Sequence, residues 1–368
     1  MRVGIEITPL NNALTGVGYY VRHLLEQLSK LPDPPEYACF ASGLRAPDTS
    51  GLAITHRRLP MPTRLLYMCW EKTGVPRVDR LLGGVDVYHA VNYVLPPVAK
   101  ARRVLSIHDL CFLRHPEWAS PKIVGPFRRT IRQHAHQADR VIACSESTKK
   151  EIVDLLELPE NRIRVIYDAA DNMFQPVEAN RARQQVAQVL GISHPFFLFV
   201  GTLEPRKNLG GLLEAFSRAK VPHHLVIAGG SGWKSSELRV QALSLSIEDK
   251  VHFTGYIHDR ALFPALYSAA TAFLFPSWYE GFGLPVLEAM ACGCPVIASN
   301  TTSMPEVGGD AMLYAAPEDA NAWTTAIQQA AEDESLRNDM RRKGLEQALK
   351  FSWRRCAEET MECYRSVL

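Results

Sequence analysis

The stretch from Pro276 to Glu288 carries the most specific chemical signal in the chain. Glu280 follows an apolar run, and Glu288 stands eight residues later in a segment with the period of a helix. Gly283 and Pro285 lie between them, and proline suits the first turn of a helix, where its missing N–H has no partner to lose. Amides at a helix start bind phosphate, and carboxylates accept hydrogen bonds from hydroxyl groups. The stretch therefore predicts a site for a sugar diphosphate.

A second polar cluster, residues 201–208, follows the apolar run Phe196–Val200 and precedes a helical segment. It begins with Gly201 and contains the adjacent cations Arg206 and Lys207. Arginine offers a planar fork of donors and lysine a compact charge, a combination that suits a diphosphate. Because both cations follow a strand directly, the cluster favours an anion site; two solvated charges on a loop are the alternative.

A histidine, His108, stands at the carboxyl end of the apolar run Arg103–Ile107. Ligands of parallel α/β sheets bind at the carboxyl ends of the strands, and imidazole titrates near neutral pH. The position indicates a role in chemistry, and a purely structural histidine is the alternative.

Gly16 and Gly18 flank Val17 at the start of a helical segment that reaches Leu28. Glycines there let backbone amides approach a phosphate or a sugar, although a plain tight turn has the same composition. The pattern is not the dinucleotide fingerprint G-x-G-x-x-G, because Val21 occupies the position of its last glycine. A dehydrogenase is therefore disfavoured.

Short β-branched runs alternate with longer segments of helical period, which is typical of parallel sheets with crossover helices. Strands are expected at Val3–Ile7, Tyr37–Phe40, Val85–His89, Arg103–Ile107, Val141–Cys144, Ile163–Ile166, Phe196–Val200, His224–Ala228, Val251–Thr254, Thr271–Phe275 and Pro295–Ser299.

These elements predict an α/β fold with two doubly wound, Rossmann-like parallel-sheet domains in series. The expected domains are residues 1–172 and residues 173–351, with the polar stretch 174–185 as their connection. A last helix, about Ser352–Val367, is expected to cross back onto the first domain.

Bulk composition excludes several classes of protein. With 41 Lys and Arg against 39 Asp and Glu, the formal net charge is +2, so no global field indicates nucleic-acid binding. The eight cysteines form no CxxC pair, which indicates reduced thiols and no metal site. No run approaches the roughly 20 apolar residues that span a bilayer, and Val3–Ile7 is too short for a signal-peptide core. A cytoplasmic protein is expected.

Taken in this order, the motifs resemble those of the GT-B glycosyltransferases of family 4, which are retaining enzymes. The resemblance covers nearly the whole chain. It rests on Glu280 and Glu288 with seven residues between them, Gly16-Val17-Gly18, His108-Asp109, residues 201–208, Gly255-Tyr256 and Ser303-Met304-Pro305-Glu306. Residues 86–93, 108–118 and 278–280 are similar to the bacterial mannosyltransferases that build surface polysaccharides.

Two departures from the family pattern are visible. Thr15 stands where the family often has a glycine, and Tyr167-Asp168-Ala169-Ala170-Asp171 stands where an Asn-Gly turn is common. The second departure concerns the edge between the two expected domains.

The resemblance implies a role for each matching residue. Glu288 would bind the ribose of the donor, and Glu280 would contact the transferred sugar near its 3-hydroxyl. Arg206 and Lys207 would hold the diphosphate and stabilise the leaving group, while His108 would lie against the 6-position of the sugar. The implied catalytic residues are His108, Glu280, Arg206 and Lys207. The implied donor-binding residues are Gly16, Gly18, Gly201, Arg206, Lys207, Phe282, Gly283, Leu284 and Glu288.

The implied activity is transfer of a hexose, such as mannose, from a nucleotide-diphosphate sugar to a glycan or lipid-linked oligosaccharide, with retention of anomeric configuration. GDP-mannose is the preferred donor. The chain has no Asp-x-Asp motif, which is consistent with a reaction that needs no metal or other cofactor. A UDP- or dTDP-sugar donor, a glycogen-synthase-like glucosyltransferase, a nucleotide-sugar epimerase and a non-catalytic sugar-nucleotide-binding module are the alternatives.

Two stretches mix cations with large apolar residues, a pattern that can lie on anionic lipid. The first contains Arg57, Arg58, Arg64, Leu65, Leu66, Tyr67, Met68 and Trp70, and the second contains Lys122, Phe127, Arg128, Arg129, Ile131 and Arg132. They predict either peripheral contact with the inner face of the cell membrane or solvated helix faces over ordinary core.

Overall fold

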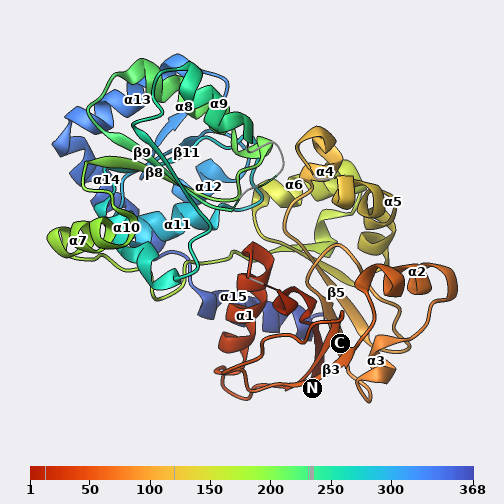
Figure 1. The fold of residues 1–368 in the computed structure, drawn as a ribbon. Helices are drawn as coiled ribbons and strands as arrows, with labels where there is room; N and C mark the ends of the chain where they lie inside the picture. Colours follow the sequence, from red (N-terminus) through yellow and green to blue (C-terminus); the bar gives the residue numbers. More distant parts are fainter. Residues whose placement is uncertain (13, 120, 231, 233–235) are drawn as a thin grey trace. The chain divides into compact units, whose positions relative to one another are not determined.

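The computed structural model describes residues 1–12, 14–119, 121–230, 232 and 236–368, which divide into two compact units (Figure 1). Unit 1 consists of Met1–Pro116, Pro121–Asp168 and Ser352–Leu368. Unit 2 consists of Glu117–Ser120 and Ala169–Phe351. Each unit is built around its own parallel sheet, as the fold class predicted from the sequence requires.

The sheet of unit 1 has seven parallel strands in the order β3-β2-β1-β4-β5-β6-β7. The central strands are buried on both faces, as crossover helices on either side require. The strands are β1 (Arg2–Glu6), β2 (Glu36–Ser42), β3 (Thr55–Leu59), β4 (Val87–Ala90), β5 (Arg102–Ile107), β6 (Arg140–Ala143) and β7 (Ile163–Val165). The edge strand β3 was not expected from the sequence.

The sheet of unit 2 has six parallel strands in the order β10-β9-β8-β11-β12-β13. They are β8 (Phe196–Val200), β9 (His224–Ala228), β10 (Val251–Gly255), β11 (Ala272–Phe275), β12 (Val296–Ser299) and β13 (Leu313–Ala315). In both sheets the strand order reverses beside the first strand of the unit. Open α/β sheets bind their ligands at that switch point, beyond the carboxyl ends of the strands.

Helices connect the strands in both units. In unit 1 they are α1 (Gly16–Leu28), α2 (Thr63–Thr73), α3 (Val78–Leu81), α4 (Cys111–Arg114), α5 (Pro121–Gln137), α6 (Glu146–Leu156) and α15 (Trp353–Arg365). In unit 2 they are α7 (Ala179–Leu190), α8 (Leu209–Ala219), α9 (Ser236–Ser244), α10 (Phe263–Ala269), α11 (Leu284–Ala291), α12 (Met304–Gly308), α13 (Ala320–Glu332) and α14 (Glu334–Ala348). Short 3-10 turns are η1 (Thr8–Asn11), η2 (Pro116–Trp118), η3 (Glu160–Arg162), η4 (Pro205–Lys207) and η5 (Arg260–Leu262).

The stretch 174–185, expected to connect the two domains, is helical in its second half. Helix α7 begins at Ala179, and the side chain of Glu178 accepts hydrogen bonds from the N–H groups of Asn180 and Arg181. A side chain that accepts from the first free amides stabilises a helix start even where the composition is polar.

The last helix, α15, returns to unit 1 and packs against α1, as predicted from the sequence (Figure 1). The Ser352 hydroxyl accepts from the N–H of Arg355 and so caps its first turn. One face of the helix is buried, at Trp353, Cys356, Ala357, Thr360, Met361, Cys363 and Tyr364. Spacings of three and four place these side chains on the same side.

The described residues bear on two expectations from the sequence, the absence of a membrane span and the state of the cysteines. None of the helices in the described ranges is long and apolar enough to cross a membrane. Seven of the eight cysteines are buried, and Cys69 is exposed.

Candidate active site

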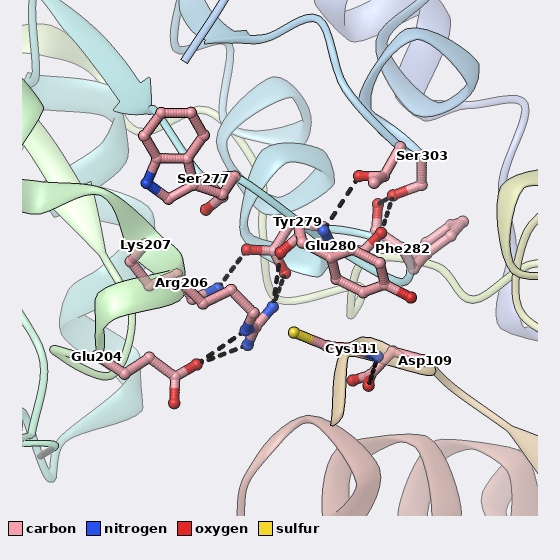
Figure 2. Close-up of polar contacts among 12 residues, drawn as sticks. Asp109, Cys111, Glu204, Arg206, Lys207, Ser277, Tyr279, Glu280, Phe282 and Ser303 are labelled. Atoms are coloured by element: carbon pink, nitrogen blue, oxygen red, sulfur yellow. Dashed lines mark hydrogen bonds and ion pairs between the residues drawn. The ribbon is translucent and has the colours of Figure 1, made fainter. Parts of the chain in front are cut away.

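The loop from β11 to α11 is shaped by one glycine and held by a neighbouring serine. Gly283 has φ +99°, and a Cβ atom there would lie 2.3 Å from the Met304 side chain, so only glycine fits. The Ser303 hydroxyl lies 3.1 Å from the carbonyl oxygen of Glu280 and 2.9 Å from that of Phe282. Ser303 thereby holds the loop at the residues on either side of Gly281 (Figure 2).

Glu280 binds both cations of the other predicted cluster (Figure 2). Its Oε1 accepts a hydrogen bond from Lys207 Nζ at 2.6 Å, and its Oε2 accepts one from Arg206 Nη1 at 2.8 Å. The same Arg206 nitrogen also donates to the carbonyl oxygen of Tyr279 at 2.9 Å. Glu280 is 7% exposed and Lys207 6%, so these ion pairs are largely shielded from water.

The cluster holds its carboxylate in the charged form. Burial alone would raise the pKa of Glu280, but the adjacent Arg206 and Lys207 lower it to about 2. Paired charges of this kind are stable when buried, whereas a single one left behind is costly. The folded protein thus places two cations beside an ionised carboxylate, and a carboxylate can accept hydrogen bonds from hydroxyl groups.

A further carboxylate, Glu204, orients Arg206 from the side away from Glu280. Its Oε1 accepts from Arg206 Nη2 at 2.7 Å and from Nε at 3.1 Å. The arginine fork is therefore held at both ends, which limits the rotamers open to it. Sequence reasoning missed Glu204, although its position two residues before Arg206 at the start of η4 is a signal for it.

Glu288 belongs to a separate group of polar side chains on α11 and its neighbours. Its Oε2 accepts from the Tyr267 hydroxyl at 3.1 Å, and its Oε1 lies 3.5 Å from Arg260 Nη2. Arg260 also donates to Asp171 Oδ2 at 3.1 Å. Burial raises the pKa of Glu288 to about 7, against the opposing effect of Arg260, so this carboxyl titrates in the neutral range. Arg260 and Tyr267 were not predicted.

The loops after β8 and β9 approach each other closely at glycines. A Cβ atom on Gly229 would lie 1.9 Å from the carbonyl oxygen of Gly201, and one on Gly232 would lie 2.3 Å from that of Leu203. The two loops can lie against each other only because these positions lack side chains. Gly201 was predicted to belong to the site, whereas Gly229 was missed, although it directly follows an apolar strand.

His108 lies in unit 1, at the carboxyl end of β5. Its Nε2–H donates to the carbonyl oxygen of Val91 at 3.0 Å, and its ring is in edge contact with Tyr20 at a centroid distance of 4.7 Å. Burial lowers the pKa of His108, so the ring is neutral at pH 7. With the proton on Nε2, the Nδ1 atom carries a lone pair and can accept a hydrogen bond or a proton.

The two predicted glycines of the first half lie in the first turn of α1. Gly16 is exposed and has open space where a Cβ would be, whereas Gly18 is buried, with the Leu14 side chain 3.0 Å from such an atom. The N-cap, Thr15, makes no side-chain hydrogen bond to the helix. The Thr15 side chain therefore does not occupy the first amides of α1, and amides at a helix start are typical donors to an anion.

Among the sequence-predicted residues, the structure brings Glu280, Arg206 and Lys207 into direct contact. Phe282, Gly283 and Leu284 connect this cluster to the helix that carries Glu288. His108, Gly16 and Gly18 belong to the other unit. Within the described ranges there is no group of three or more His, Cys, Asp or Glu that could hold a metal ion.

Comparison with known proteins assigns the class. Glycosyltransferase Family 4 matches residues 14–172, and Glycosyl transferases group 1 matches residues 182–347. The O-antigen chain mannosyltransferase B of Escherichia coli is 30% identical over an alignment of 386 residues, gaps included. The alignment covers 99% of this chain and 100% of that protein.

Solved structures agree on the fold. Sucrose-phosphate synthase from Thermosynechococcus elongatus has a TM-score of 0.81 at 24% identity, over 100% of this chain and 98% of that chain. The Anabaena protein HepE, in complex with UDP and glucose, has a TM-score of 0.79 at 19% identity and is covered completely, as is this chain. The two parallel sheets and these matches define a glycosyltransferase with the GT-B fold. Within that class, the chain belongs to glycosyltransferase family 4, as its motifs predicted.

Proposed function

We propose that this protein is a retaining glycosyltransferase of surface polysaccharide synthesis that transfers mannose, or a related hexose, from GDP-mannose to a glycan or lipid-linked oligosaccharide. The observation that carries the proposal is the buried group in which Arg206 and Lys207 both bind Glu280. The full-length similarity to an O-antigen chain mannosyltransferase supports the choice of sugar.

The roles of the two halves follow from where the groups lie. Residues 173–351 bind the donor, because Glu280, Glu288, Arg206 and Lys207 are all in unit 2. Residues 1–172, together with 352–368, bind the acceptor and supply His108, Gly16 and Gly18 to the sugar end of the donor. Gly201 and the backbone of Phe282, Gly283 and Leu284 contact the sugar and the phosphates.

The proposed chemistry needs negative charge to be stabilised as the nucleoside diphosphate leaves. Arg206 and Lys207 supply that charge stabilisation, and Glu280 accepts a hydrogen bond from the 3-hydroxyl of the sugar. Glu288 accepts hydrogen bonds from the ribose, and the Nδ1 atom of His108 accepts one from the 6-hydroxyl. By analogy with a lost oxyanion donor, each cation contributes about 100- to 1000-fold in rate. With both cations supplied by side chains, the transfer proceeds without a metal ion or other cofactor.

Retention of configuration is part of the proposal because of the family to which the chain belongs. In a front-face route the acceptor attacks from the side that the diphosphate leaves, through an oxocarbenium-like state. Proton NMR of the first product tests this: a retaining enzyme gives the anomer of the donor, and the opposite anomer contradicts the route.

A panel of donors tests the proposed activity. GDP-mannose, UDP-glucose and a dTDP-hexose are compared by release of nucleoside diphosphate and by the thermal shift of the protein. A donor at a hundredfold excess over its Kd stabilises the folded state by about 2.7 kcal/mol. GDP-mannose is expected to give the largest shift and the fastest release.

A UDP-sugar donor is the second candidate, because the Anabaena relative of similar fold was solved with UDP and glucose. A larger response to UDP-glucose than to GDP-mannose would replace the first assignment with this one. Binding without turnover of any donor would instead support a non-catalytic sugar-nucleotide module.

An exposed basic surface on β3 and α2 supports peripheral contact with anionic lipid at the inner face of the cell membrane. Arg57, Arg58 and Arg64 are exposed, as are Leu65 (50%) and Met68 (43%). The second predicted stretch fits the alternative better. Ile131 there is fully buried, Arg128, Arg129 and Arg132 face solvent, Phe127 contacts other rings, and the side chain of Lys122 lies outside the described residues.

Vesicle co-sedimentation tests the membrane contact. Binding to vesicles that contain phosphatidylglycerol, but not to pure phosphatidylcholine, is expected, and it should weaken for Arg64→Glu. The control, Arg354→Glu, changes the same charge on the exposed side of α15. Equal binding by both variants would contradict a role for the α2 surface.

A further inference from the structure

A chain of buried hydrogen bonds connects four elements of unit 1. His89, on β4, has Nδ1 at 2.8 Å from the hydroxyl of Tyr364 on α15 and Nε2 at 2.8 Å from the hydroxyl of Ser106 on β5. The Ser106 oxygen lies 3.1 Å from the hydroxyl of Tyr20 on α1. None of the four side chains is more than 3% exposed.

The imidazole at the centre of this chain is uncharged, because burial lowers the pKa of His89 to about 3. A neutral imidazole donates from one nitrogen and accepts at the other, so it needs one hydroxyl on each side. Tyr364 and Ser106 provide them, and the removal of either leaves a buried nitrogen unsatisfied. A fully satisfied buried network of this kind fixes the geometry of the groups that it joins.

This series of hydrogen bonds ends at Tyr20, which contacts the ring of His108. Tyr20 makes edge contact with the His108 ring at 4.7 Å, with the two planes at 73°. It also packs against Trp353 at 6.2 Å, in the first turn of α15. Tyr20, Ser106 and His108 lie around one narrow gap that is too small to hold a water molecule. The last helix thus reaches Tyr20 in two ways, through the hydroxyl chain and through the Trp353 ring.

We propose that Tyr20, Ser106, His89 and Tyr364 are positioning residues that hold the His108 ring in its orientation for the transfer reaction. The inference rests on the role of His108 in the proposed function. In this account the helix that returns from unit 2 is part of the support of the active site, because its Tyr364 and Trp353 fix Tyr20.

Single hydroxyl deletions test the proposal. Tyr364→Phe and Ser106→Ala each remove one member of the chain. Tyr88→Phe is the matched control, because its hydroxyl is buried on the same strand as His89 and has no hydrogen-bond partner among the described residues. We expect each chain variant to lower kcat about fivefold, the equivalent of one hydrogen bond, with the KM for the donor unchanged. The fold decrease in kcat of the double variant should be much smaller than the product of the two single decreases, because one substitution already interrupts the series of hydrogen bonds.

A readout independent of turnover separates positioning from loss of packing. Ring-nitrogen NMR of protein with labelled histidine, with the His108 signals identified by their absence in His108→Gln, reports the environment of that ring. The signals are expected to shift in Tyr364→Phe and Ser106→Ala but not in Tyr88→Phe. If Tyr364→Phe and Ser106→Ala both have the His108 ring-nitrogen signals and the kcat of the control, the inference is overturned.

A further variant separates the failure of this inference from the failure of the proposed function. If His108→Ala is inactive while the chain variants behave like Tyr88→Phe, the positioning role falls and the proposed function stands. If His108→Ala keeps full activity, the role of His108 falls, and the positioning inference falls with it.

Discussion

At the scale of single residues, the two predicted carboxylates have opposite electrostatic surroundings. Glu280 lies between Arg206 and Lys207, which keep it ionised, whereas burial raises the pKa of Glu288 to about 7. Two carboxyl groups on one loop and helix can therefore take different tasks. One is a permanent acceptor beside two cations, and the other changes its charge around neutral pH.

The first prediction concerns Arg206. Arg206→Ala removes one of the two cations that would stabilise the leaving diphosphate, so kcat should fall about 100- to 1000-fold while the protein stays folded. Arg218→Ala, on the exposed side of α8, is the control and should keep its activity. Steady-state kinetics of both variants measures kcat, and circular dichroism checks that they are folded. Near-normal turnover by Arg206→Ala would refute the leaving-group role.

The second prediction concerns pH and Glu288. Its ionised form accepts two hydroxyl hydrogen bonds better than its protonated form, and its pKa of about 7 means that protonation grows as the pH falls through 7. The KM for the donor should rise below about pH 7 and level off above it. In Glu288→Gln this dependence should disappear. An equally steep profile in that variant would contradict the assignment.

Arg260 and Tyr267 were missed for one physical reason. Arg260 stands 28 positions before Glu288 and Tyr267 stands 21 positions before it, so their contacts form only when the chain folds. Glu280, Arg206 and Lys207 could be predicted because each lies in the connection that follows a strand. Their mutual contact could be expected only from the rule that parallel strands bring their carboxyl ends to one edge.

At the scale of elements, strands that are buried on both faces were predictable. Strands β8 and β9 occur where the sequence predicted them, because each is a continuous apolar run. Strand β3 was missed because its sequence, Thr-His-Arg-Arg-Leu, is nearly all exposed, and β13 because its three residues, Leu-Tyr-Ala, include no β-branched side chain. Edge strands are defined by pairing with a neighbour rather than by an apolar pattern.

The third prediction concerns Asp168, in the connection after β7, and the pH dependence of the stability of the folded protein. Its Oδ1 is buried with no hydrogen-bond partner among the described residues, and burial raises its pKa to about 7. The folded protein holds this proton more tightly than the unfolded chain, so stability should fall as the pH rises from about 4 to about 7, and then level off. The loss is on the order of 4 kcal/mol.

Asp168→Asn keeps the shape of the protonated group without its charge. The variant should unfold at a higher temperature than the wild type at pH 8, and the difference should shrink at pH 5. Asp154→Asn, at an exposed position of α6, is the control and should show no such pH dependence. If Asp168→Asn is no more stable than wild type at pH 8, the carboxyl is not held neutral in the folded protein.

At the scale of the whole molecule, sequence and structure agree on two parallel-sheet units and on a last helix that returns to the first. The alternation of strands and helices specified this layout, because a parallel sheet needs a crossover after every strand. The chemistry of the whole enzyme is expected to depend on side-chain cations alone. Treatment with EDTA should therefore leave the rate unchanged, and a loss that Mg²⁺ or Mn²⁺ restores would contradict the metal-free account.

The central claim is that the buried group of Glu280, Arg206 and Lys207 is the donor site of a hexosyltransferase. The most direct test is the release of GDP from GDP-mannose, with a mannose-terminated oligosaccharide as acceptor, by wild type and by Glu280→Gln. The variant keeps the volume of the side chain but loses the charge, and Glu334→Gln, at an exposed position, is the control. We predict turnover by wild type and control and nearly none by folded Glu280→Gln. Wild-type turnover by that variant would contradict the claim.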